Sequence, residues 1–197
     1  MTTFNISIAQ RLYKLVETTL SNIQYTYIKN DVTIFNKKLK GEKVKPGHYK
    51  ARQKISERFM SISAAQKELK TYVREAHGYE SVDIFKIISN PSLQKLESIL
   101  KMNISILETS ENIIKMTLTK NRSVYGFNPE SLHVTLGSYR NERKKLIEVR
   151  LALNNYIQGK SMYDRENKLL KDSGDAAVNA FHKARVTSGG VGSIISE

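Results

Sequence analysis

Histidine and carboxylate side chains are the groups of this chain that could do acid–base or metal chemistry, because the sequence contains no cysteine. His133 is followed two residues later by Thr135, in the string LHVTLGS, so an imidazole and a hydroxyl lie close together. Two imidazoles can act together as acid and base on a phosphodiester. The surroundings of the other three histidines therefore decide whether this chemistry is available.

The string around His133 resembles one half of the signature of two-histidine phosphoesterases, in which a His-x-Thr/Ser pair lies on each of two strands. The resemblance covers about four residues of 197 and implies a second copy of the pair. The other histidines lie in the strings GHYKA (His48), AHGYE (His77) and FHKAR (His182), and none repeats the pattern. A phosphodiester-cleaving enzyme around His133 is therefore the third of three functional hypotheses.

Carboxylates alternate with cations in the C-terminal part of the chain, at Asp164, Arg165, Glu166, Lys168, Lys171, Asp172 and Asp175. Opposite charges three or four residues apart on a helix form ion pairs, whereas a metal site needs converging histidines or carboxylates. No phosphate-binding glycine loop, dinucleotide fingerprint or Ser-His-Asp spacing occurs. The sequence predicts no metal, no cofactor, no small-molecule substrate, no catalytic residue and no enzyme activity.

The strongest functional signal is a run of positive charge. Residues 29–58 carry ten basic and three acidic side chains, a net of +7 out of +13 for the chain. Within residues 36–54 the only acid is Glu42, and the basic residues are Lys37, Lys38, Lys40, Lys43, Lys45, Lys50, Arg52 and Lys54. Lysine suits diffuse attraction to a polyanion more than bidentate reading of bases. We predict a polyanionic partner, either DNA, RNA or an acidic protein surface; the alternative is a solvated loop.

A second basic cluster lies in the string YRNERKKLIEVR, at Arg140, Arg143, Lys144, Lys145 and Arg150. Arg143 and Arg150 fall in a heptad seam of otherwise mostly apolar residues, which is an awkward place for arginine in a dry core. Either the apolar stripe drifts onto Ile147 and Val149 and leaves both arginines at its edge, or this face meets DNA or an acidic partner. The sequence supports these two alternatives equally.

The spacing of apolar residues is helical along most of the chain. It predicts helices over residues 7–38, 49–76, 90–120, 129–157 and 161–185, with a short helical link over 81–88. Prolines at 46, 91 and 129 mark starts or breaks, Asn90 and Asn128 are the expected N-caps, and Gln158-Gly159 is the expected stop. A strand over residues 113–119 is an alternative, because β-branched residues are frequent there. Phe59, Leu69, Leu100 and Leu107 are predicted core residues.

These elements predict an all-α fold: an elongated antiparallel bundle of four long helices plus a C-terminal helix and an extended tail. The predicted domains are residues 1–157, a helical bundle with the basic loop 36–54; residues 158–186, the additional helix; and residues 187–197, the tail. In the tail, Ile194 and Ile195 either insert into a neighbouring subunit or belong to a disordered end.

Our first hypothesis is a non-catalytic structural or assembly component of a large nucleic-acid-containing complex, such as an interior or connector protein of a phage-type virion. Its partners are then protein subunits together with DNA, RNA or an acidic surface. The second hypothesis is a free-standing basic helical module that binds nucleic acid or regulates. No apolar run reaches the roughly 20 residues of a membrane span, and the start does not read as a signal peptide. We therefore expect an intracellular location, or one inside a virus particle.

Overall fold

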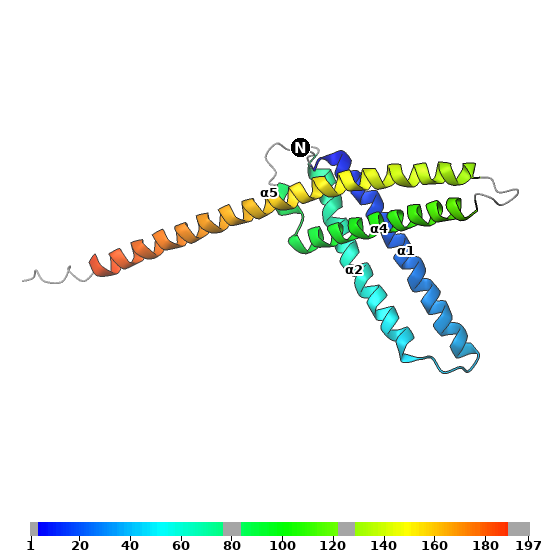
Figure 1. The fold of residues 1–197 in the computed structure, drawn as a ribbon. Helices are drawn as coiled ribbons and strands as arrows, with labels where there is room; N and C mark the ends of the chain where they lie inside the picture. The colour runs from blue at the N-terminus through cyan, green and yellow to red at the C-terminus, as the bar shows by residue number, and fades with distance from the viewer. Residues whose placement is uncertain (1–3, 77–83, 122–128, 189–197) are drawn as a thin grey trace, which may run out of the picture. The chain divides into compact units, whose positions relative to one another are not determined.

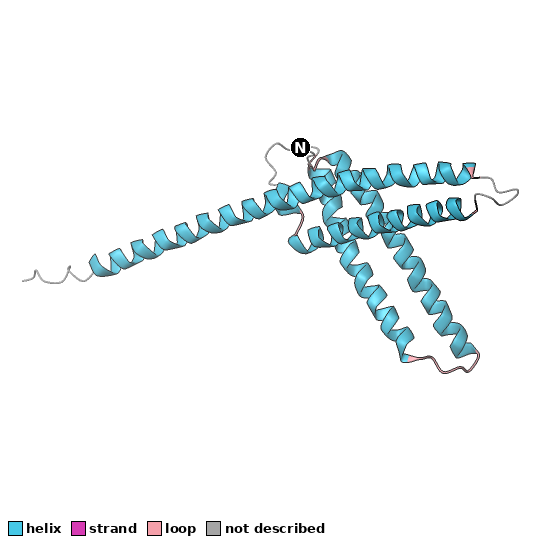
Figure 2. Ribbon diagram, viewed as in Figure 1, coloured by secondary structure: helices cyan, strands magenta, loops and turns pink. Residues whose placement is uncertain are grey.

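The computed structural model describes residues 4–76, 84–121 and 129–188, which are almost entirely helical (Figures 1 and 2). Their helices are α1 (Ile6–Leu39), α2 (Pro46–Glu75), α3 (Ile84–Ile87), α4 (Asn90–Lys120) and α5 (Glu130–Ser188). These ranges contain no strand, which confirms the all-α class and shows that the alternative strand over 113–119 is wrong. The threonines there fit a helix, because their hydroxyls donate to carbonyls four residues earlier, as Thr117 does to Ile113 at 2.9 Å.

Contacts divide the chain into two units, residues 1–156 and 157–197. In the first unit α1 and α2 form one antiparallel hairpin, and α4 and the first part of α5 form another (Figure 1). The two hairpins cross, and both α1 and α2 pack against α4. Long helices thus pair antiparallel, as expected for a helical bundle, but they do so as crossed hairpins.

The core of the first unit lies where the hairpins cross. Its fully buried residues come from all four long helices: Leu12, Val16, Leu69, Leu96, Leu100 and Leu153 are each 0% exposed. Of the four predicted core residues, Leu69 and Leu100 are buried, whereas Phe59 and Leu107 are only half-buried. Phe59 and Leu107 lie on parts of α2 and α4 where few residues are buried. The two hairpins cover each other only where they cross.

Four aromatic side chains extend this core at the end of α1 nearest the N-terminus. Phe4 packs against Tyr72 and Tyr156 with ring centroids 5.2 Å apart in both pairs, and Phe85 lies 5.3 Å from Tyr156. The Tyr72 hydroxyl donates to the Phe4 carbonyl at 2.9 Å, so the buried phenol has a partner, and burial raises its pKa. The cluster joins residues from α2, α3, α5 and the segment before α1.

Several helix boundaries differ from the sequence prediction: α2, for example, begins at Pro46 rather than at residue 49. The N-cap of α4 is Ser89 rather than Asn90, because the Ser89 hydroxyl accepts from Ser92 N–H and is itself bonded to the Glu68 carboxylate of α2 at 2.9 Å. The predicted stop at Gln158-Gly159 is wrong, since α5 continues through it to Ser188. A glycine inside a helix costs only about 1 kcal/mol, which helix-forming neighbours can offset. The predicted tail was 187–197, but residues 187 and 188 belong to α5, which ends at Ser188. The predicted N-cap Asn128 and residues 189–197 of that tail lie outside the described residues.

The end of α1 requires glycine. Gly41 has a φ of +68°, and its N–H donates to the Lys38 carbonyl at 3.1 Å while the Glu42 N–H donates to the Lys37 carbonyl at 2.9 Å. This pair of bonds is the Schellman arrangement, in which the residue after the cap adopts the left-handed conformation. Gly41 therefore turns the chain out of α1 toward α2.

Gly41→Ala is expected to destabilise the protein by about 1 kcal/mol, because a side chain disfavours the left-handed conformation. Gly137→Ala, inside α5, is expected to stabilise it by about 0.5 to 1 kcal/mol through helix propensity. Neither new methyl group meets an atom within 4 Å, so backbone conformation alone separates the two. Thermal unfolding followed by circular dichroism measures both, and shifts of equal sign would contradict the assignment.

Candidate polyanion-binding arm

The far ends of α1 and α2 project beyond the crossing as a two-helix arm, residues 24–57, with the loop between them at its tip (Figure 1). Burial supports this description: α1 has one buried residue after Ile23, namely Ile34, and α2 has none before Ile62. The predicted basic residues 37–54 all lie on this arm. The fold thus gathers them at one end of the first unit.

Several polar contacts order the tip without neutralising it. The Asn30 side-chain amide donates to the His48 carbonyl at 3.1 Å, and Lys37 Nζ lies 3.4 Å from His48 Nε2. Lys38 Nζ lies 5.9 Å from the centre of the Tyr49 ring, a cation–π contact. None of these contacts supplies a negative charge, so the lysines of the tip keep their attraction for an external anion.

Arg52 differs from its neighbours on the arm because it is held within the chain. Its Nε donates to the Tyr27 hydroxyl at 2.8 Å and lies 3.1 Å from Asp31 Oδ1. The hydrogen bond to Tyr27 and the charge of Asp31 together raise the pKa of Arg52. Arg52 therefore acts first as a bond between α1 and α2, although it was predicted as a polyanion contact.

Six lysines at and near the tip of the arm have exposed side chains. The exposed side chains Lys38, Lys40, Lys43, Lys45, Lys50 and Lys54 form no ion pair with any described residue. Each one carries a hydrated charge on a long stem that can reach a phosphate at little cost in structure. These six residues form the tip cluster, which is the candidate site.

The second basic cluster, on α5, differs from the tip cluster because its arginines pair with carboxylates of the chain itself. Arg143 Nε donates to Glu111 Oε1 at 2.5 Å and its Nη2 donates to Glu111 Oε2 at 3.2 Å, while Arg140 Nε lies 3.8 Å from the same carboxylate. Glu111 is 1% exposed on α4, and its hydrogen bond raises the pKa of Arg143. The acidic partner of these two arginines is therefore within the chain.

Arg150 also pairs with a carboxylate of α4, but at a longer distance. Its Nη2 lies 4.0 Å from Glu97, which Lys101 approaches more closely, at 2.7 Å. Lys145 lies 3.8 Å from Glu142 on its own helix, and Lys144 is exposed. Val149 is buried at 1% exposure, whereas Ile147 is 39% exposed, so the predicted drift of the apolar stripe holds for Val149 alone.

His133 is exposed on the first turn of α5, and its backbone N–H donates to the Pro129 carbonyl at 2.9 Å. Of the other histidines, His48 lies in the tip of the arm, His77 lies outside the described ranges and the side chain of His182 is not described. Among the residues that the structure describes, no three histidines, aspartates or glutamates are grouped as a metal site requires.

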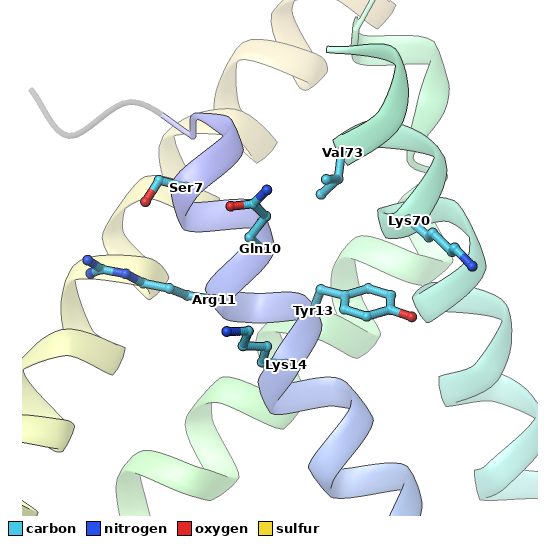
Figure 3. A pocket seen from close by; sticks show the side chains of 7 residues that line it. All are labelled: Ser7, Gln10, Arg11, Tyr13, Lys14, Lys70 and Val73. Carbon is cyan, nitrogen blue, oxygen red and sulfur yellow. The ribbon is translucent and has the colours of Figure 1, made fainter. Parts of the chain in front are cut away.

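A hollow of about 490 Å³ lies beside α1 and α2, and Arg11, Lys14 and Lys70 are among its lining residues (Figure 3). All three are exposed, and Figure 3 shows the charged ends of Arg11 and Lys70 pointing in opposite directions. A ligand pocket requires polar groups that converge on one point. The hollow therefore adds positive charge to the surface but does not form a second site.

Comparison with protein-family models, with curated proteins and with solved structures finds no match for this chain. None of the helices in the described ranges has a stretch long and apolar enough to cross a membrane.

Sequence reasoning missed Glu111 and the outer face of the arm. Glu111 falls between polar residues, so no pattern marks it as buried, and only the approach of α5 shows its role. The outer face of α1 does carry a signal. Apolar residues at 25, 28, 32, 35 and 39 recur there in alternating steps of three and four.

Proposed function

We propose that this protein is a non-catalytic structural or assembly component of a nucleic-acid-containing complex and that its arm binds the phosphate backbone. The observation that carries the proposal is the contrast between the two basic clusters. The arginines on α5 are bonded to Glu111 and Glu97, whereas the tip cluster has no ion pair within the described residues. Only the tip cluster retains its full charge for an external partner.

Lysine-rich tips bind nucleic acid mainly by releasing the counterions that surround it. Each phosphate neutralised on B-DNA changes the slope of log K against log salt by about 0.9, so five lysines in contact predict a contribution of about 4 to 5. The tip cluster contains no arginine, and lysine does not read base edges by bidentate bonds. The expected binding is strong at low salt and independent of sequence.

The assembly role is supported by exposed apolar residues on several helices. Phe35 on α1 is 60% exposed, and Ile106 and Ile113 on α4 are 54% and 57% exposed. Such residues in series are typical of protein contacts. A virion interior or connector protein is the example that we favour, with the cytoplasm or the particle as its location. The alternative is a free-standing module, which would bind nucleic acid through the same tip but would not need contacts with other protein subunits.

The test compares two variants of equal net charge. The tip variant changes Lys40, Lys43, Lys45, Lys50 and Lys54 to glutamine; the control variant changes Lys115, Lys120, Lys144, Lys168 and Lys171 to glutamine. Each removes five charges from +13 and leaves +8. We expect the tip variant to bind a 30-base-pair duplex at least ten-fold more weakly at low salt, with a salt slope smaller by about 4.

The control variant should lose much less affinity, and both variants should keep wild-type helicity, since exposed charges contribute little to stability. Fluorescence anisotropy over a range of salt concentrations measures the slopes. Equal losses in the two variants would show that the charge acts without regard to position. No loss in the tip variant would contradict the proposal.

A further inference from the structure

The outer face of α1 carries a continuous apolar seam along the arm. Its five side chains are half or more exposed: Tyr25 at 69%, Ile28 at 52%, Val32 at 50%, Phe35 at 60% and Leu39 at 70%. Single exposed apolar residues are ordinary, but five in alternating steps of three and four along one helix are a pattern. We call these residues the outer seam.

The outer seam lies on the side of α1 opposite to α2. At 100° per residue, the centre of the seam falls about 140° away from the centre of Ile23, Tyr27 and Ile34, which are buried or half-buried between the helices. Each of α1's two faces therefore has its own apolar residues along the arm. The inner face is covered by α2, and no described residue covers the outer one enough to bury it.

The spacing of the outer seam indicates what kind of surface would cover it. A strict repeat of three and four makes a narrow stripe, as in the seam of a coiled coil, whereas helices that lie on lipid have a much wider apolar face. The seam spans 15 residues, or about 22 Å at 1.5 Å per residue. A single helix of at least two heptads matches this length and width.

The charges beside the outer seam indicate the chemistry of that helix. Lys29 and Lys40 lie along one edge and Lys38 along the other, and all three are exposed. The one acid at the edges, Asp31, is paired with Arg52 at 3.1 Å. A second copy of α1 would bring the same lysines and no acid free to neutralise them. The edges therefore favour a partner with carboxylates.

We propose that the outer seam binds an amphipathic helix of a partner protein that has an apolar heptad seam flanked by glutamate or aspartate. Apolar side chains of the two helices interdigitate, and carboxylates at the flanking positions pair with Lys29, Lys38 and Lys40. The inference deepens the proposed assembly role and rests on it. The arm then has two uses, with nucleic acid at its tip and a protein helix along its outer face, and Lys38 and Lys40 belong to both surfaces.

A synthetic peptide tests the seam directly. The probe is a 21-residue peptide with isoleucine and leucine at the seam positions and glutamate at the flanking positions; its control has lysine at the flanking positions. The chain has no cysteine, so Asn36→Cys provides one labelling site beside the seam. We expect the acidic peptide to bind at micromolar concentration and to change the fluorescence of the label, and the lysine peptide to bind at least ten-fold more weakly.

Matched variants locate the site. Val32→Asn with Phe35→Asn removes the centre of the outer seam, while Ile106→Asn with Ile113→Asn removes similar exposed apolar residues from α4. The first pair should weaken peptide binding at least ten-fold and the second should not change it. Both pairs should keep the wild-type circular dichroism spectrum, because the replaced residues are at least half exposed.

The outcomes separate this inference from the nucleic-acid role. A second tip variant changes only Lys43, Lys45, Lys50 and Lys54 to glutamine, so that Lys40 beside the seam is kept. It should bind the peptide within about three-fold of wild type at 0.15 M salt, where the screening length is about 8 Å. The Val32 and Phe35 variant should keep its DNA affinity. Peptide binding that survives that variant would overturn the proposal. Seam-dependent self-association in sedimentation would instead identify a second copy as the occupant, and seam-dependent binding to anionic vesicles would identify lipid.

Discussion

Replacing Leu100 with alanine is expected to lower the free energy of unfolding by about 3 to 5 kcal/mol. Leu100 is 0% exposed at the crossing of the hairpins, where Leu96 of its own helix and Leu12 and Leu69 of the other hairpin are equally buried. A truncation there removes apolar contacts and leaves a cavity that the surrounding helices can close only in part. Urea unfolding monitored by circular dichroism measures the change.

Ile106→Ala on the same helix is the matched control. Ile106 is 54% exposed, and its replacement should change the free energy of unfolding by no more than about 0.5 kcal/mol. The contrast depends on the crossed arrangement, because the other hairpin covers only part of α4 and leaves Ile106 exposed. Equal effects at the two positions would show that α4 does not pack on the other hairpin through Leu100.

Replacing Arg143 alone is expected to destabilise the protein more than replacing Arg143 and Glu111 together with leucine. The single change leaves the Glu111 carboxylate buried, with Arg140 at 3.8 Å as its remaining cation. An unpaired buried carboxylate costs more than a buried apolar side chain of similar size. Because Glu111 is 1% exposed, losing the hydrogen bonds from Arg143 is expected to lower the free energy of unfolding by about 1 to 3 kcal/mol.

Thermal melts of Arg143→Leu, Glu111→Leu and the double variant form a complete cycle for this pair. The double variant should melt above Arg143→Leu. Lys144→Leu, which replaces an exposed cation one residue away, is the control and should melt near wild type. Additive losses in the double variant would show that the two side chains do not act as a pair.

The pairing of Arg143 with Glu111 also bears on function. Part of the second basic cluster pairs with Glu111 and so connects α5 to α4. The proposal of nucleic-acid binding therefore rests on the tip of the arm. The sequence could not separate the two clusters, because both are dense in charge. What distinguishes them is whether a buried carboxylate from another helix lies within reach.

Local patterns were sufficient for the helices themselves. Apolar spacing predicted residues 7–38 as a helix, and α1 spans Ile6–Leu39; residues 90–120 were predicted, and α4 spans Asn90–Lys120. Such agreement is expected, since helix formation depends on residues three and four apart and on the prolines and caps nearby. The same local signals failed at Gly159, where a glycine between helix-forming residues was mistaken for a stop.

Tertiary structure alone decided which apolar residues are covered and which charges are free. Leu100 and Ile106 are both apolar residues of the helix predicted over 90–120, yet only Leu100 is buried, because the other hairpin crosses α4 over a limited length. Arg143 and Lys43 carry the same charge, yet Arg143 meets Glu111 while Lys43 has no ion pair within the described residues. The sequence determined the helices, the concentration of lysines and the composition of the loop. Burial and ion pairing depend on distances between residues far apart in the chain, which no local pattern encodes.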